Sequence, residues 1–107
     1  MVGPAPLRQD GRVTSAGRSW TLLTNHGRIL LMLARTPDAR LRDLAEEAGI
    51  TERSVQAIIA DLEQSGYVTK QRVGRRNTYR VNRSRPFRHS AESGHVVGEL
   101  LELFDDT

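Results

Sequence analysis

Residues 41–68 have the sequence LRDLAEEAGITERSVQAIIADLEQSGYV, which predicts two short helices joined by a tight turn. The first helix, around residues 42–48, has four apolar residues on its inner side: Leu41, Leu44, Ala45 and Ala48. Gly49 follows, where a left-handed residue is least costly, and the Thr51 hydroxyl is suited to cap the next helix. That second helix ends at Gly66 and has one apolar face, formed by Val55, Ile58, Ile59 and Leu62.

Further elements are predicted on both sides of this helix pair. A helix from Thr24 or Asn25 ends at Thr36, because the residue before a proline is pushed out of the helical region. Beyond Gly66, residues 67–69, 71–73 and 78–81 have strand character, and residues 74–77 are predicted to form the turn of a hairpin. A last helix is predicted from Glu92 or Ser93, with an apolar stripe of Val96, Val97, Leu100, Leu101 and Phe104.

Charge is distributed unevenly along the chain, although the net charge is only +3. Residues 67–90 carry eight basic side chains and no acidic one, whereas residues 91–107 carry five acidic side chains and no basic one. A basic block of this density attracts polyanions such as nucleic acid. A solvated basic surface without a partner has the same composition, and that alternative stays open.

The order helix, short helix, glycine turn, helix and basic hairpin is typical of a winged helix-turn-helix. In that arrangement the third helix enters the major groove of double-stranded DNA, and Arg75 and Arg76 at the hairpin tip reach phosphates or the minor groove. We therefore expect a mainly α fold with a small β-hairpin and an extra C-terminal helix. Residues 1–19 are expected to be a flexible arm, residues 20–82 the winged helix-turn-helix DNA-binding domain, and residues 83–107 a linker and dimerisation helix.

The composition excludes several classes of protein. The chain has no cysteine, so disulfides, thiolate metal sites and thiol catalysis are excluded. The apolar run over residues 29–34 is too short to span a bilayer, and residues 1–10 lack the pattern of a secretory signal. We expect a cytoplasmic protein with no membrane contact. No nucleophile elbow, phosphate-binding glycine loop or acid–base pair occurs, so we expect no enzymatic activity and no cofactor.

Three segments resemble the ArsR and MarR families of winged-helix transcriptional regulators. Residues 24–30 (TNHGRIL) resemble the opening helix of ArsR-type repressors, and residues 41–68 resemble the helix-turn-helix shared by both families. Residues 74–81 (GRRNTYRV) are similar to the wing and its returning strand. The resemblance implies a homodimer that binds a pseudo-palindromic operator in double-stranded DNA. It leaves open whether a small-molecule effector exists.

The resemblance also implies three sets of site residues. Base contacts are expected from the third helix, which is called the recognition helix. Arg53 is the strongest candidate for a guanine contact, and its alternative role is a salt bridge or a phosphate contact. The recognition-helix set is Thr51, Arg53, Ser54, Gln56 and Ala57, where Ala57 replaces a basic residue common in ArsR-type helices. The wing set is Lys70, Arg72, Arg75, Arg76 and Asn77. The dimer-interface set is Trp20, Val96, Val97, Leu100, Leu101 and Phe104, unless the last helix only covers the chain's own core.

Two other functions stay open. Winged helices also serve as protein-docking domains, and Ala57 and Ala60 give the third helix an outer face with little charge. A ligand-responsive or metal-responsive repressor is the second alternative. The thiolate box of some ArsR proteins is absent, and we expect no bound metal. The alternative metal ligands are His95 and Glu99, with Glu92 and Glu102 at spacings that would share one helix face.

Overall fold

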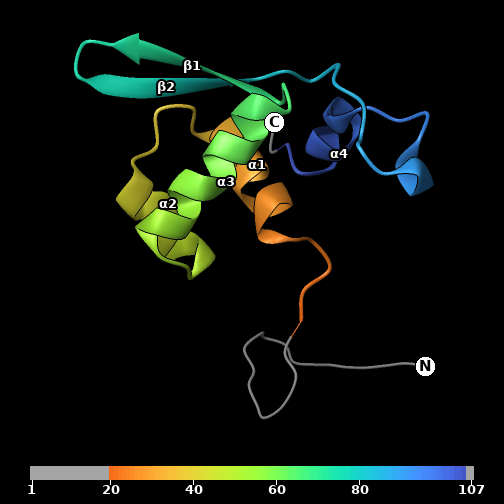
Figure 1. The fold of residues 1–107 in the computed structure, drawn as a ribbon, viewed down its shortest axis with the longest axis horizontal. Helices are drawn as coiled ribbons and strands as arrows, with labels where there is room; N and C mark the ends of the chain where they lie inside the picture. Colours follow the sequence, from red (N-terminus) through yellow and green to blue (C-terminus); the bar gives the residue numbers. More distant parts are fainter. Residues whose placement is uncertain (1–19, 106–107) are drawn as a thin grey trace.

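A computed structural model describes residues 20–105, and the predicted arm over residues 1–19 lies outside them. Figure 1 shows a bundle of helices with a hairpin lying across one end. The elements in chain order are α1 (Asn25–Arg35), α2 (Leu41–Ala48), α3 (Glu52–Gln64), β1 (Val68–Val73), β2 (Arg76–Val81), the short 3₁₀ helix η1 (Ser90–Glu92) and α4 (Val97–Leu103). This confirms the predicted winged helix-turn-helix with an additional C-terminal helix.

The caps of the first three helices follow from local sequence. The Thr24 side chain accepts a hydrogen bond from the first turn of α1, and α1 stops at Arg35, just before Thr36 and Pro37. Helix α2 ends at Gly49 in the left-handed conformation (φ 74°), a geometry that favours glycine. Only three residues separate α2 from α3, so the two helices form the tight pair that the sequence predicts.

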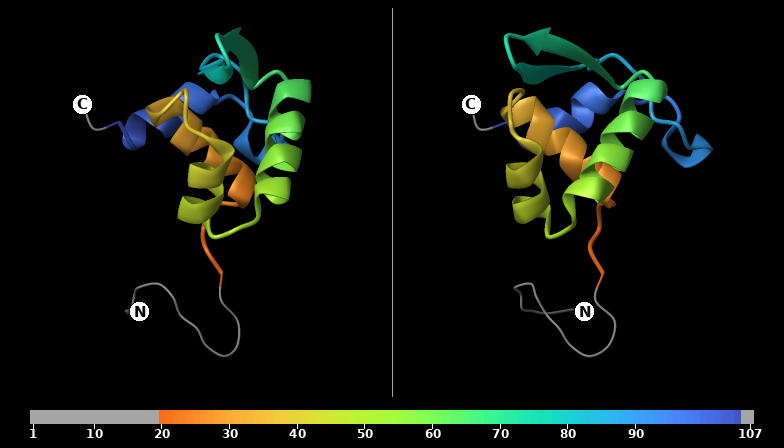
Figure 2. Two further views of the ribbon diagram at one scale, coloured as in Figure 1. Left: turned by 90° about the vertical axis from the view of Figure 1, so that its left-hand side faces the viewer. Right: turned by 60° about the vertical axis from the view of Figure 1, so that its left-hand side comes forward.

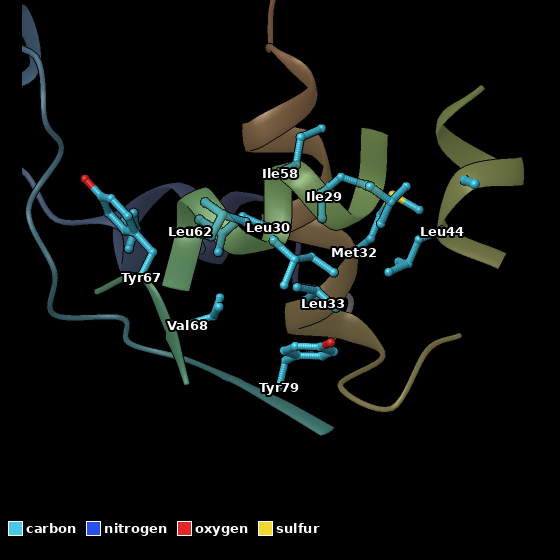
Figure 3. Close-up of a cluster of buried hydrophobic side chains, with 14 residues drawn as sticks. Ile29, Leu30, Met32, Leu33, Leu44, Ile58, Leu62, Tyr67, Val68 and Tyr79 are labelled. Atoms are coloured by element: carbon cyan, nitrogen blue, oxygen red, sulfur yellow. The ribbon is translucent and has the colours of Figure 1, made fainter. Parts of the chain in front are cut away.

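One hydrophobic core joins the three helices to the hairpin. Its side chains come from the apolar faces of α1, α2 and α3, and Val68 and Tyr79 of the hairpin lie against these helices (Figure 3). Ile29, Leu33 and Val55 are fully buried, and no charged or polar side chain within residues 20–105 is. The core therefore fixes how α3 and the hairpin lie relative to each other.

The hairpin is longer and its turn tighter than predicted. Strand β1 pairs antiparallel with β2 from Val68↔Val81 to Val73↔Arg76, so the turn consists of Gly74 and Arg75 alone. The prediction of a four-residue turn over residues 74–77 is wrong, because Arg76 and Asn77 already belong to β2. Gly74 has a φ of 63°, as the first position of a two-residue hairpin loop requires.

The C-terminal helix begins later than predicted. Residues 93–96, which follow η1, are not helical: Gly94 has a φ of 90°, and Val96 pairs with Pro86 in an isolated β-bridge. Helix α4 therefore starts at Val97, and the predicted start at Glu92 or Ser93 is wrong. Val97 and Leu101 are almost fully buried (2% and 1% exposed), so this helix packs on the body of its own chain.

Candidate nucleic-acid interface

Helix α3 presents an exposed, polar N-terminal half. Thr51 accepts a hydrogen bond from the Ser54 amide (3.0 Å), and its hydroxyl donates to the Ser54 hydroxyl (3.0 Å). These two residues of the recognition-helix set thus hold the first turn of the helix together. Arg53, Gln56 and Ala57 are all exposed, and among the described residues neither Arg53 nor Gln56 has a recorded side-chain partner. Arg53 and Gln56 are therefore the long side chains at this end of α3 that can donate hydrogen bonds.

A basic hollow of about 450 Å³ lies between the start of α2 and the wing tip. Its lining includes four arginines, Arg40, Arg42, Arg75 and Arg76, and two acidic residues, Asp38 and Glu52. Arg40 and Arg42 were not among the site residues predicted from the sequence. Helix α2 begins at Leu41, and no side chain caps it. The first backbone amides of α2, which lie at this end of the molecule, therefore have no side-chain acceptor.

Two hydrogen bonds attach the wing to the loop between α1 and α2. The Tyr79 amide donates to the Pro37 carbonyl oxygen (2.9 Å), and the Arg76 guanidinium donates to the Asp38 carbonyl oxygen (2.9 Å). Arg75 at the tip is exposed and has no recorded hydrogen bond or ion pair within residues 20–105. The two neighbouring arginines therefore differ: Arg76 holds the wing in place, whereas Arg75 is free to meet a ligand.

The pairing of β1 with β2 determines which of the remaining wing residues share a face of the hairpin. Lys70 lies opposite Tyr79 and Arg72 lies opposite Asn77, so these four side chains share one face of the hairpin. Tyr79 on that face is buried, whereas Lys70, Arg72 and Asn77 are exposed. Burial raises the pKa of Tyr79 above its ordinary value, the Glu63 carboxylate adds to this rise, and a hydrogen bond with Asn77 opposes it. The phenol therefore stays neutral around neutral pH.

The residues predicted at a dimer interface separate into two groups. Val97 and Leu101 belong to the interior of the single chain, whereas Val96 and Leu100 are half-buried. Trp20 is 78% exposed and Phe104 is 38% exposed. Surface for another molecule is therefore offered by Trp20, Phe104 and the half-buried pair of Val96 and Leu100. The dimer interface stays a prediction.

The proposed metal ligands do not share a helix face. Glu92 precedes α4, so the helical spacing expected for Glu92, His95, Glu99 and Glu102 is wrong. The Glu99 carboxylate contacts His95 Nδ1 (2.7 Å) and accepts a hydrogen bond from the Val96 amide (3.2 Å), and both contacts lower the pKa of Glu99. Nowhere in residues 20–105 are three His, Asp or Glu side chains arranged to hold a metal ion.

A second, larger hollow of about 740 Å³ lies at the opposite end of α3, where its last turn meets the start of α1 and the segment around η1. Leu30, Leu62 and Phe87 are among its apolar lining residues. Arg88 and His89 also line it, as does the pair in which His26 Nε2 lies 2.8 Å from the Asp61 carboxylate. No ligand site was predicted at this position from the sequence.

The three-helix core, the short turn before α3 and the basic wing define a winged helix-turn-helix protein. The model of the MarR family matches residues 20–76, so the chain belongs to the MarR family. This is a family of transcriptional regulators rather than enzymes, in agreement with the prediction from sequence. No relative was found among curated proteins.

Solved structures show the same fold. One match is the crystal structure of the Mycobacterium tuberculosis MarR family protein Rv2887 in complex with salicylic acid, with a TM-score of 0.51 and 20% sequence identity. The similarity covers 76% of this chain but only 56% of that protein, so the chain spans little more than half of its structural relative. Within residues 20–105, no helix is long and apolar enough to cross a membrane.

Proposed function

We propose that this protein is a transcriptional regulator that binds double-stranded DNA as a homodimer in the cytoplasm. The observation that carries the proposal is the basic hollow, which gathers Arg40, Arg42, Arg75 and Arg76 beside the exposed start of α3. Guanidinium groups bind phosphate oxygens well because they donate several hydrogen bonds in a planar array. The hollow is therefore suited to hold the DNA backbone while α3 lies in the neighbouring major groove.

Two side chains of α3 carry the base reading in this proposal. Arg53 is long enough to donate two hydrogen bonds to one guanine, and Gln56 to pair with an adenine edge. Thr51 and Ser54 contribute less, because their hydroxyls already bond to each other and to the helix N-terminus. Ala57 leaves room for the helix to approach the base edges closely. Sequence specificity should therefore depend on Arg53 and Gln56 more than on any other residue.

A salt series with a mixed pool of duplex DNA tests the proposal, followed by sequencing of the retained duplexes. If four arginines of each protomer meet phosphates, the logarithm of the binding constant falls with the logarithm of salt at a slope of about −3.6 per protomer. Enrichment of a pseudo-palindrome would support a dimer that reads sequence. Absence of any retained DNA at low salt would refute DNA binding and favour the protein-docking alternative.

A second candidate function rests on the larger hollow at the end of α3. We propose that it binds a small aromatic acid as an effector. Its volume of about 740 Å³ and its apolar lining suit a small organic ligand, and Arg88 and His89 supply donors for a carboxylate. The structural relative is a complex with salicylic acid, an acid of this type.

Isothermal titration with salicylate and with 2-hydroxybenzyl alcohol, its uncharged analogue, tests this second candidate. The acid should bind to the wild-type protein, and Arg88→Ala should weaken its binding. Arg83→Ala is the matched control, because Arg83 does not line the hollow. Equal binding of both compounds, or equal effects of the two substitutions, would refute a carboxylate site at Arg88.

A further inference from the structure

Three successive carbonyl groups at the end of α3 accept hydrogen bonds from the segment that follows the hairpin. The Ser65 carbonyl oxygen accepts from Arg85 Nε (3.0 Å), and the Gly66 carbonyl oxygen accepts from Asn82 Nδ2 (3.3 Å). The Tyr67 carbonyl oxygen accepts from the Asn82 amide (2.8 Å). The positive charge of Arg85 is favourable at this place, because the C-terminal end of a helix carries partial negative charge.

The Arg85 guanidinium packs closely over Gly66. A Cβ atom at Gly66 would lie 3.1 Å from both Nε and Cζ of Arg85, which is closer than ordinary van der Waals contact. Only a residue without a side chain permits this close approach. The Arg85 side chain is therefore held at the end of α3 by its hydrogen bond to Ser65 and by its packing over Gly66.

The backbone of the same segment is attached to the start of α4. The Val97 amide donates to the Arg85 carbonyl oxygen (2.9 Å), and the Gly98 amide donates to the Arg83 carbonyl oxygen (2.9 Å). In the right view of Figure 2, the chain after β2 passes the end of α3 before it reaches η1. Arg85 thus contacts α3 through its side chain and α4 through its backbone, a double contact called the Arg85 bridge below.

A small movement at this end of α3 becomes larger at the other end, where Arg53 is proposed to contact bases. The helix has 13 residues and is therefore about 20 Å long. A tilt of about 5° around its last turn displaces its first turn by about 1.7 Å, which is more than the range of distances that a hydrogen bond tolerates. Packed helices can slide by small amounts over an apolar core, whereas directional hydrogen bonds at the helix end oppose this sliding.

We propose that Arg85 is a positioning residue for base reading: it sets the direction of α3 by joining the end of this helix to α4, and it does not itself contact DNA. This inference rests on the proposed DNA binding through α3. By sequence, Arg85 belongs to the basic block over residues 67–90, whose charge favours contact with a polyanion. Its guanidinium instead binds the Ser65 carbonyl oxygen, at the end of α3 opposite to Arg53.

Binding of the full chain to DNA over a salt series separates positioning from phosphate contact. The probes are the duplex enriched from the mixed pool and an unrelated duplex of equal length. Arg85→Ala should weaken binding of the enriched duplex about 5-fold or more, because a base contact is misplaced. Its salt slope and its affinity for the unrelated duplex should not change. Arg75→Ala should instead weaken binding of both duplexes and reduce the slope by about 0.9 per protomer.

Arg85→Lys is the conservative variant in this experiment. It keeps the charge and a donor for the Ser65 carbonyl oxygen but loses the planar guanidinium, so it should restore part of the discrimination between the two duplexes. A salt slope reduced by about 0.9 in Arg85→Ala would show that Arg85 contacts phosphate, and would overturn the inference. Unchanged discrimination in an Arg85→Ala protein with a lowered Tm would show a role in stability alone, and would also overturn it.

Amide hydrogen exchange tests the Arg85 bridge without DNA. Arg85→Ala should accelerate exchange at residues 65–67 about 5-fold, the effect expected from the loss of one hydrogen bond. Arg80→Ala is the matched control and should leave this exchange unchanged. Arg80 lies in the same basic block, is exposed, and has no recorded side-chain partner within residues 20–105.

The outcomes distinguish this inference from the proposed function. Unchanged exchange at residues 65–67 in Arg85→Ala would overturn the Arg85 bridge, even if the wild type binds DNA with sequence preference. A wild-type protein that retains no duplex at low salt would refute the proposed function and with it the role in base reading. Accelerated exchange in Arg85→Ala would in that case still establish that Arg85 holds the end of α3.

Discussion

Single replacement of Arg75 and of Arg76 by alanine separates contact with DNA from support of the wing. The two residues are neighbours with the same side chain, so the substitutions remove the same charge and nearly the same surface. Arg76 donates to the Asp38 carbonyl oxygen (2.9 Å), whereas Arg75 has no recorded partner within residues 20–105. We expect Arg75→Ala to change DNA binding alone and Arg76→Ala to change both DNA binding and stability.

The magnitudes follow from general rules for each interaction. Loss of one phosphate contact reduces the salt slope by about 0.9 per protomer, so the affinity ratio of wild type to variant falls roughly 3.5-fold between about 50 and about 200 mM salt. Loss of the exposed Arg76 hydrogen bond costs about 1 kcal/mol, which lowers the Tm of a domain of this size by about 5 °C. Arg75→Ala should leave the Tm unchanged.

Fluorescence anisotropy over a salt series gives the slope, and calorimetric melting of the free protein gives the Tm. Arg76→Lys is the control that keeps the positive charge but changes the hydrogen-bonding geometry at Asp38. The reasoning is refuted if the two alanine variants melt at the same temperature. An unchanged salt slope in Arg75→Ala would remove the wing tip from the DNA contacts.

Three further predictions concern the elements that support the site. Thr51→Ala removes the side-chain cap of α3 and should lower the free energy of unfolding by about 1 kcal/mol, measured by urea denaturation. Gly98→Ala should displace α4, because an added Cβ would lie 2.9 Å from the Arg83 carbonyl oxygen; hydrogen exchange of the α4 amides reports this. His95→Ala should raise the pKa of Glu99 toward its ordinary 4.5 in an NMR titration.

The Glu99 result also fixes the direction of a pH effect. A carboxyl group with a lowered pKa in the folded state stabilises the fold above its ordinary pKa and loses that contribution as the pH falls through the lowered value. The wild type should therefore lose stability relative to His95→Ala on acidification below about pH 4.5. Identical acid unfolding of the two proteins would contradict the assigned contact. The Gly98→Ala prediction would be contradicted by slow hydrogen exchange throughout α4. The Thr51→Ala prediction would be contradicted by a variant as stable as the wild type.

Local sequence was sufficient to predict the bounds of α1, α2 and α3. The residue before Pro37 ends α1, Gly49 permits the left-handed turn, and Thr51 caps α3, and each of these effects depends on neighbours within four residues. The hairpin turn was predicted too wide because Gly74-Arg75-Arg76-Asn77 is polar throughout, and only pairing with Val73 shows that Arg76 is in a strand.

Features that depend on distant contacts could not be predicted in this way. The start of α4 is set by the bridge between Pro86 and Val96, which joins residues ten positions apart. The basic hollow depends on the wing lying beside the α1–α2 loop, a contact between Arg76 and Asp38 across 38 residues. No periodicity in the sequence reports such contacts, so Arg40 and Arg42 were not recognised as part of the site.

The attachment of the wing to the α1–α2 loop has a consequence for the spacing of bases in an operator. Because Pro37 and Asp38 hold β2 while the core holds α3, the distance between the wing tip and the start of α3 is fixed within one protomer. One inserted base pair shifts the flanking DNA by about 3.4 Å and rotates it by about 35°. In the proposed DNA complex, such an insertion inside a half-site should therefore prevent α3 and the wing of one protomer from binding at the same time.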